Sequence, residues 1–302
     1  MFIIKYRKIF FTLSVFMIIG SIVAMAVFGF NFGVDFKGGS VLEVSYEESR
    51  PSLEEIKNNL SGLNDGDTDL LGTYTVVPSG DLNYIIKTKA ITPGAKTLIL
   101  QLITTEINGI PREVRFNSIG PVVGEQLKNK ALIAITLVII CIVLFITFAF
   151  RKVSQPVASW KYGLATIIAL AHDIIIPTGV FILWSRFYGG EIDLLFVTAL
   201  LAILGYSVHD TIVVFDRVRE NLRNSSNKES FVEIVGKSVN QTFGRSINTS
   251  ITIFLALFAL YFIGGESTKD FAFVLLVGVV AGTYSSIFVA SPLLVTLEKL
   301  QK

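Results

Sequence analysis

Long apolar stretches constrain this chain more than any other feature of its sequence. A helix needs about 20 apolar residues to cross the roughly 30 Å hydrocarbon core of a bilayer. Six stretches have that length, at residues 9–30, 131–150, 162–184, 194–215, 246–263 and 271–297. Only 17% of the residues are charged, whereas about 25% is usual in a soluble domain. The sequence therefore predicts an α-helical polytopic membrane protein with six transmembrane helices, one followed by five.

The first apolar stretch has two interpretations. It follows Lys5, Arg7 and Lys8, and it contains Ala24-Met25-Ala26, which resembles a signal-peptide cleavage site. The apolar core of a signal peptide is usually about 7–15 residues long, and this stretch is longer than 20. We expect a retained transmembrane helix, with a cleaved signal peptide as the alternative.

Basic residues in the short connections predict how the chain is oriented. Fourteen Lys and Arg residues fall on one side of the predicted helices, and only Arg186 and Lys269 fall on the other side outside the 31–130 segment. Short loops rich in Lys and Arg stay in the cytoplasm. We therefore expect both termini and the 217–244 loop to be cytoplasmic, and residues 31–130 to be extracytoplasmic.

The polar segment at residues 31–130 separates residues 1–30, with the first helix, from residues 131–302, with the other five. The predicted strands are 41–46, 71–77, 84–88 and 112–118, and the predicted helices are 51–60 and 93–108. This β-α-β-β-α-β order is that of a ferredoxin-like α+β domain. The segment contains no His or Cys, so we expect a binding or mechanical domain rather than an enzyme.

The 217–244 loop contains an amphipathic pattern. Its apolar residues at helical spacing are Phe231, Ile234, Val235 and Val239. The pattern predicts a helix lying at the membrane interface. Covering the end of the bundle and contacting a partner are both open as its role.

Two His-Asp pairs lie inside predicted transmembrane helices, His172-Asp173 in the third and His209-Asp210 in the fourth. A charge at bilayer depth costs at least about 2.5–3.5 kcal/mol, so an intramembrane Asp is a functional candidate. Burial disfavours the charged form of a carboxyl group, and a nearby guanidinium favours it. Arg245 stands where the fifth helix enters from the side nearer Asp210. We expect the two to pair and to load and release a proton.

Structural roles are the alternative for each of these residues. A buried Asp can fix helix packing through hydrogen bonds. Asp173 has no apparent cationic partner, so packing and proton transfer are equally open there. Packing is the favoured interpretation for His172 and His209. Two sets of small or polar residues also predict helix packing: Asn248, Thr249, Ser250 and Thr252, some of which could line a polar path, and Gly278, Gly282, Ser285 and Ser286.

Cysteine, histidine and net charge exclude several classes of protein. One Cys, Cys141, and two His exclude internal disulfides and a Cys-rich or His-rich metal site. We therefore expect no metal and no cofactor. The net charge is +2, and the basic residues sit at the ends of apolar stretches. This arrangement suits a lipid bilayer and gives no support for nucleic-acid binding.

Several motifs resemble the SecD/SecF family, part of the RND-like superfamily. The sequence GVDFKGGS at residues 33–40 resembles the signature that opens the outer domain of the family's SecF branch. The residues at its matching positions are Gly33, Asp35, Phe36, Gly38 and Gly39. The sequence SIGPVVG at residues 118–124 resembles the family's SVGPxVG before the second helix.

Two further motifs lie in the helical part. HDTIVVFDRVREN at residues 209–221, with Asp216 and Arg217, resembles the NDTIVVFDRIREN of the SecF branch, apart from His in place of Asn at position 209. The SecD branch has DANVLIFERI instead. RSINTS at residues 245–250, with Asn248 and Thr249, resembles RTLNTS at the start of the fifth helix.

The resemblance implies an accessory subunit of the bacterial Sec protein-export machinery in the inner membrane. Such a subunit uses the proton-motive force to drive late translocation and release of precursor polypeptides. By motif, Asp210 would be the protonatable group and Arg245 its partner. The implied partners are SecD, which supplies a homologous six-helix half, the SecYEG translocon with SecA, YajC, and the precursors.

Two other functions serve as alternatives. Aspartates on neighbouring helices also occur in intramembrane aspartyl proteases, but the YD and GxGD motifs of those enzymes match neither Ala171-His172-Asp173 nor Val208-His209-Asp210. We therefore expect no enzyme. The second alternative is an RND-like exporter of a small molecule or lipid, which the half-sized chain and the SecF-like motifs disfavour.

Overall fold

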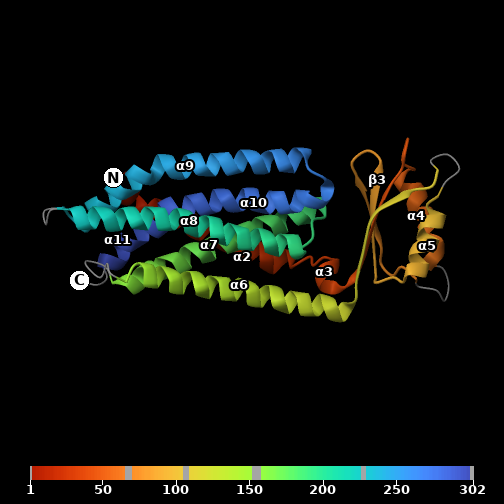
Figure 1. Cartoon of the computed structure of the whole chain (residues 1–302), viewed down its shortest axis with the longest axis horizontal. Helices are drawn as coiled ribbons and strands as arrows, with labels where there is room; N and C mark the ends of the chain where they lie inside the picture. The colour runs from red at the N-terminus through yellow and green to blue at the C-terminus, as the bar shows by residue number, and fades with distance from the viewer. Residues whose placement is uncertain (1, 65–69, 105–108, 152–157, 226–228, 300–302) are drawn as a thin grey trace.

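The computed structural model describes residues 2–64, 70–104, 109–151, 158–225 and 229–299. A helical bundle occupies one end of the elongated molecule and a small α+β domain the other (Figure 1). The N- and C-termini both lie at the end of the bundle far from the α+β domain.

Within the described residues, six helical segments are long and apolar enough to cross a membrane. They are α2 (Arg7–Phe28), α6 (Pro121–Ala149), α7 (Ser159–Tyr188), α8 (Leu194–Asn224), α9 (Phe231–Ile263) and the continuous segment Glu266–Lys299. The last comprises α10 (Glu266–Ser285), a π-helical turn η2 (Ser286–Ala290) and α11 (Ser291–Lys299). A short helix α1 (Phe2–Lys5) precedes α2. The predicted one-plus-five arrangement is confirmed.

The 217–244 connection is mostly helical, not a loop with a separate interfacial helix. Helix α8 runs on to Asn224, and α9 begins at Phe231 after a capping box in which Ser230 and Glu233 bond each other's backbone N–H groups. No Pro interrupts the chain between Phe231 and the predicted fifth span, so the amphipathic segment continues into that span as one helix. Its apolar face is buried against the bundle, as the spacing predicts.

The α+β domain has the predicted ferredoxin-like element order. Its elements are β1 (Gly39–Ser45), α4 (Leu53–Ser61), the 3₁₀ turn η1 (Gly62–Asn64), β2 (Thr75–Ser79), β3 (Asn83–Thr88), α5 (Pro93–Leu102) and β4 (Arg112–Ile119). The sheet is antiparallel with strand order β2-β3-β1-β4. Both helices lie on the face of the sheet away from the bundle (Figure 1), where their apolar residues and those of the sheet form the domain's core.

Two boundaries in this domain differ from the prediction. The predicted strand 71–77 is replaced by β2 at Thr75–Ser79, because Gly72 has φ +64°, outside strand geometry, although Leu71 is buried in the core. Pro78 lies inside β2 and not in the turn, which an edge strand permits. Helix α5 ends at Leu102, and the predicted continuation over 105–108 lies outside the described residues.

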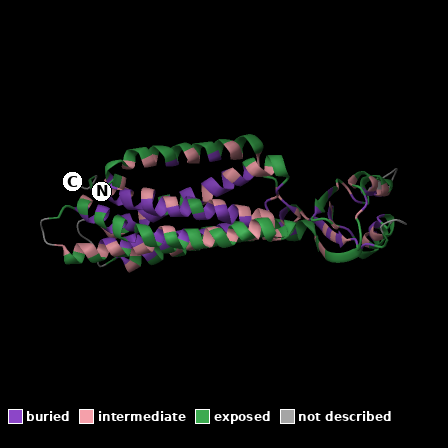
Figure 2. Ribbon diagram, turned by 90° about the horizontal axis from the view of Figure 1, so that it is seen from above, coloured by how far each residue is buried: buried purple, intermediate pink, exposed green. Residues whose placement is uncertain are grey.

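Burial divides the membrane helices into an inner and an outer set. Of the most apolar window in each helix, 61% is buried in α7 but only 11% in α2, α6 and α9. Buried residues follow the middle of the bundle, and exposed ones cover its outside (Figure 2). The exposed side chains of the outer set include Phe16, Leu144 and Phe262. An apolar outer surface of this kind suits the hydrocarbon of a bilayer.

Candidate functional site

Small residues bring α10 close to α8 at the centre of the bundle. A Cβ atom on Gly278 would lie 2.1 Å from Ile203 Cδ1, and one on Gly282 would lie 3.0 Å from Ser207 Cβ. The predicted packing role of these two glycines is therefore confirmed. The same face of α10 continues one turn later into Ser285, so the hydroxyl of that residue meets the neighbouring helices.

Asp173 of α7 is completely buried, and both of its oxygens have partners. The Nδ1 atom of His172 lies 2.9 Å from Asp173 Oδ1. Ser207 of α8 and Ser285 of α10 both donate hydrogen bonds to Oδ2, the second over 2.7 Å. Three inner helices thus contribute to one carboxyl group.

Asp210 of α8 is 8% exposed and is held by two hydroxyl groups. Ser246 of α9 donates to Oδ1 over 2.6 Å, and Ser286 of η2 donates to Oδ2. The chain neighbour of Ser286 is Ser285, which donates to Asp173. Consecutive residues at the change from α-helix to π-helix therefore bind the two intramembrane carboxyl groups.

Arg245 is not where the sequence analysis placed it. Its side chain is exposed, and among the ion pairs of the described residues none joins it to Asp210. It lines a polar cavity of about 310 Å³ with Asp216, Arg217 and Glu220. Adjacent side chains on a helix point about 100° apart, so Ser246 and Arg245 meet different parts of α8, Ser246 at Asp210 and Arg245 beside Asp216, Arg217 and Glu220. The predicted contact is replaced by the Ser246 hydrogen bond.

Of the other predicted polar residues, some belong to the buried hydrogen-bond network and some are exposed at the surface. His172 is buried beside Asp173, whereas His209 is exposed and makes none of the hydrogen bonds found among the described residues. Asn248 and Thr249 are also exposed. Their neighbour Ser250 instead bonds Tyr206 and Thr283 over 2.6 Å each, which ties α8, α9 and α10 together as packing polar residues do.

Sequence reasoning missed the serines as site residues, since Ser285 and Ser286 were assigned to packing. Their position one turn beyond Gly282 and two turns beyond Gly278, on the side of α10 that packs on α8, is the signal that their hydroxyl groups lie near α8. Hydroxyl, carboxyl and imidazole groups can together bind and pass a proton. Within the described part of the chain, no group of three or more His, Cys, Asp and Glu residues could hold a metal ion.

The 33–40 motif forms the junction between the α+β domain and the bundle. A short helix α3 (Val34–Lys37) holds Asp35 and the buried Phe36. The N–H of Gly33 donates to the carbonyl of Ile192 over 2.9 Å, and the Asp35 carboxylate accepts from the N–H of Leu194 over 3.0 Å. The motif thus joins the end of α2 to the start of α8.

Two glycines of this motif are required by the backbone. Gly38 has φ +79°, and a Cβ there would lie 2.7 Å from Pro121 Cα, where α6 begins. Gly39 has φ +148°, and its Cβ would lie 2.7 Å from the carbonyl oxygen of Thr88. L-residues rarely adopt such angles. These glycines let β1, β3 and α6 meet at one point.

A polar cavity of about 230 Å³ separates the sheet from the bundle at this junction. Lys87 of β3 and Glu191, before α8, form an ion pair of 2.9 Å across it. Asp193 caps α8 by accepting from the N–H of Phe196 over 2.8 Å. Burial, with smaller contributions from Asp35 and Asp270, raises the pKa of Asp193 to about 6.

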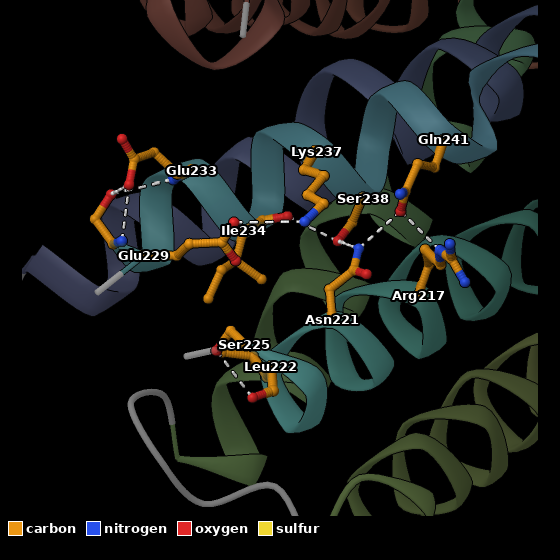
Figure 3. Close-up of polar contacts among 11 residues, drawn as sticks. Arg217, Asn221, Leu222, Ser225, Glu229, Glu233, Ile234, Lys237, Ser238 and Gln241 are labelled. Carbon is orange, nitrogen blue, oxygen red and sulfur yellow. Dashed lines mark hydrogen bonds and ion pairs between the residues drawn. The ribbon is translucent and has the colours of Figure 1, made fainter. Parts of the chain in front are cut away.

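The other end of the bundle is clamped by residues of the 209–221 motif (Figure 3). Asn221 of α8 donates to Ser238 and to Gln241 of α9, both over 2.8 Å, and Arg217 donates to the same Gln241 oxygen over 2.7 Å. Asp216 forms an ion pair with Arg219 on its own helix. The motif therefore fixes α9 against α8 next to the turn that carries Arg245 and Ser246.

Two models of protein families and several known proteins match this chain. The family described as "Protein export membrane protein SecD/SecF, C-terminal" matches residues 101–300, and the "SecD/SecF GG Motif" matches residues 23–49. "Protein translocase subunit SecF" of Thermobaculum terrenum is 41% identical, with 98% of this chain and 93% of the relative covered. The SecF of Anaerolinea thermophila is 36% identical, with 97% and 92% covered.

A solved structure shows the same fold. It is that of SecDF from Thermus thermophilus, titled a translocon-associated membrane protein, with a TM-score of 0.80 and 28% identity. The match covers 98% of this chain but only 38% of SecDF, so the chain spans well under half of that protein. On motifs, sequence and fold alike, the chain belongs to the SecD/SecF family of protein-export membrane proteins.

Proposed function

We propose that this chain is the SecF-type subunit of a Sec protein-export complex, and that it uses inward proton flow to drive late translocation and release of precursors. The observation that carries the proposal is the pair of buried carboxyl groups, Asp173 and Asp210. A charge at that depth is costly, and the two described donors to Asp210 are neutral hydroxyl groups. Proton binding and release at Asp210 would therefore change the strength of the hydrogen bonds that join α8 to α9 and η2.

The names of the relatives favour transport over catalysis and over export of small molecules. Both relatives are named translocase subunits, and the solved structure is that of SecDF. SecD is accordingly the proposed partner and the source of the second six-helix half. SecYEG, SecA, YajC and precursor polypeptides are the further proposed partners. The proposed location is the bacterial inner membrane, with both termini cytoplasmic and residues 31–130 extracytoplasmic.

Energy of the right size is available from the proton-motive force. One elementary charge moved across 100 mV releases about 2.3 kcal/mol. Loss of the proton from Asp210 leaves a buried charge, which strengthens its hold on Ser246 and Ser286, and proton uptake weakens it. Because these serines lie on α9 and η2, each cycle would shift two helices against α8. The junction at the 33–40 motif would transmit that shift to the α+β domain.

Tethering the α+β domain to the bundle tests this proposal. Lys87→Cys with Glu191→Cys, in a Cys141→Ser background, puts two thiols where the ion pair crosses the junction. A short thiol cross-linker should then stop export of a pulse-labelled precursor in cells that carry this chain with its SecD, and a cleavable linker should restore export when reduced.

The matched control joins two thiols inside the domain without tethering it. Lys96→Cys with Glu113→Cys replaces an ion pair of the same length, 2.9 Å, between α5 and β4. Export should continue after this pair is cross-linked. Unchanged export with the junction cross-linked would contradict movement of the domain as part of the cycle.

A further inference from the structure

His172 and Asp173 form a buried acid–imidazole pair whose role the proposal for Asp210 leaves open. His172 is 1% exposed and Asp173 is 0% exposed. The carboxyl group has three partners, namely His172 Nδ1, Ser207 and Ser285. A group this well satisfied could be wholly structural. The imidazole ring argues otherwise.

The second ring nitrogen of His172 lacks a partner. Nε2 is buried and makes no hydrogen bond within the described part of the chain. The ring stacks on Tyr284 of α10, with centroids 5.8 Å apart and planes 13° from parallel. The Tyr284 hydroxyl is directed elsewhere, to the carbonyl of Phe10 over 2.8 Å. A buried polar atom left unpaired costs about 1–3 kcal/mol, and such an atom in a native fold calls for an explanation.

The pair is connected to Asp210 through the turn where α10 becomes η2. Ser285 donates to Asp173 and Ser286 to Asp210, while Ser207, which also bonds Asp173, lies one turn before Asp210 on α8. A change in charge on either carboxyl group therefore acts on the same few residues. Among the described residues, the titratable groups facing the pair are Tyr284 and, through Ser285 and Ser286, Asp210.

We infer that His172 and Asp173 together hold a second transferable proton, with His172 Nε2 as the atom that takes it up and releases it. When Nε2 binds a proton, the Nδ1 proton passes to Asp173 Oδ1. The pair then changes from neutral imidazole and carboxylate to neutral imidazole and carboxylic acid, with a net gain of one proton. This inference deepens the proposed function and rests on it, since the second proton would be exchanged with Asp210.

Infrared difference spectra between acid and alkaline pH test the inference directly. The sample is the purified full-length chain in lipid vesicles, and the signal is the carbonyl stretch of protonated carboxyl groups. We expect two buried-carboxyl bands, one lost in Asp173→Asn and the other in Asp210→Asn. His172→Gln should keep the Asp173 band but shift its frequency, because the carboxyl group loses its imidazole partner. His209→Gln, which changes an exposed His beside the other Asp, should leave both bands in place.

The outcomes separate this inference from the proposed function. If Asp210→Asn removes a band while Asp173→Asn and His172→Gln change nothing, the inference is wrong and the proposed function stands. If neither Asp variant changes the spectrum, both fail. An equal shift in the two His variants would also overturn the inference. Should Asp173→Asn not fold, Ser285→Ala replaces it, because loss of that donor must shift the Asp173 band; an unmoved band overturns the inference.

Discussion

Ser246 Oγ lies 2.6 Å from Asp210 Oδ1, while Arg245, its neighbour in the chain, is exposed and lines a polar cavity with Asp216, Arg217 and Glu220 of α8. The hydroxyl group that bonds Asp210 thus belongs to the residue next to Arg245, whose guanidinium the sequence predicts as the partner. In this arrangement the carboxyl group is neutralised by no described cation. When Asp210 gains or loses a proton, its hydrogen bonds with the hydroxyl groups of Ser246 and Ser286, on two other helical segments, must then change.

The Ser246 hydrogen bond should contribute measurably to stability. Ser246→Ala removes one of two donors to a buried carboxyl group, which should cost about 1–3 kcal/mol and lower the unfolding temperature of the purified protein. Thr252→Ala is the matched control, because the Thr252 hydroxyl is exposed and bonds only the carbonyl of Asn248 in its own helix. Equal unfolding temperatures for Ser246→Ala and wild type would contradict the contact.

Close packing of α10 on α8 should be sensitive to a single methyl group. Gly278→Ala places a Cβ 2.1 Å from Ile203 Cδ1, so the helices must separate or Ile203 must move. Overpacking of this kind typically costs about 1–3 kcal/mol. Gly205→Ala, on the partner helix α8 and with nothing within 4 Å of its Cβ, should be tolerated. Thermal unfolding of both variants measures the difference, and equal tolerance would rule out the close approach.

Gly38 should not tolerate substitution, whereas Gly120, a neighbour across the same junction, should tolerate it. Gly38→Ala forces φ +79° on an L-residue and a Cβ to within 2.7 Å of Pro121 Cα. With ψ at 154°, this positive φ lies in a region that glycine almost alone adopts, and it costs an L-residue about 1–3 kcal/mol. Gly120 has φ −67° and open space around its Cβ, so Gly120→Ala should fold normally. Limited proteolysis at the junction should be faster in Gly38→Ala; identical digestion of the two variants would argue against the account.

Asp193 should make the junction less stable as the pH rises. Its pKa is about 6 in the folded chain against 3.8 for an exposed Asp, so the folded state binds this proton more tightly. The contribution of this proton to the free energy of unfolding is complete below about pH 4 and is lost as the pH rises through about 6. That contribution is on the order of 2 kcal/mol, from about 1.4 kcal/mol per pKa unit reduced for the partial exposure of the side chain. Asp193→Asn should flatten the unfolding temperature between pH 4 and 7. The exposed turn variant Asp81→Asn should keep the wild-type profile, and a wild-type profile in Asp193→Asn would refute the assignment.

Much of the architecture could be predicted because it depends on length and periodicity. The six spans, the order of the α+β elements and the glycine contacts of α10 follow from apolar runs, turn residues and spacing. The predicted boundaries were less accurate where a residue is buried like a strand residue but the backbone does not have strand geometry. Leu71 is buried as a strand residue would be, yet Gly72 turns the backbone away.

The site was only partly predictable, because rotation about a helix axis decides which of two neighbours faces inward. The sequence alone marks Asp173 and Asp210 as costly to bury, but charge complementarity favours Arg245 over Ser246 as a partner. The π-helical turn at Ser286–Ala290 has no apparent sequence signal. The spacing from Gly282 indicates that Ser285 and Ser286 lie near α8, but the bond that each makes to a particular carboxyl group could not be predicted from the sequence.

The most direct test of the central claim is export in cells whose only copy of this chain carries Asp210→Asn. The change is nearly isosteric and leaves a side chain that cannot ionise. The account predicts that a pulse-labelled precursor accumulates while the variant is made in normal amounts and still assembles with SecD, and that the exposed control Asp81→Asn exports normally. Export at the wild-type rate with Asn at position 210 would contradict the account.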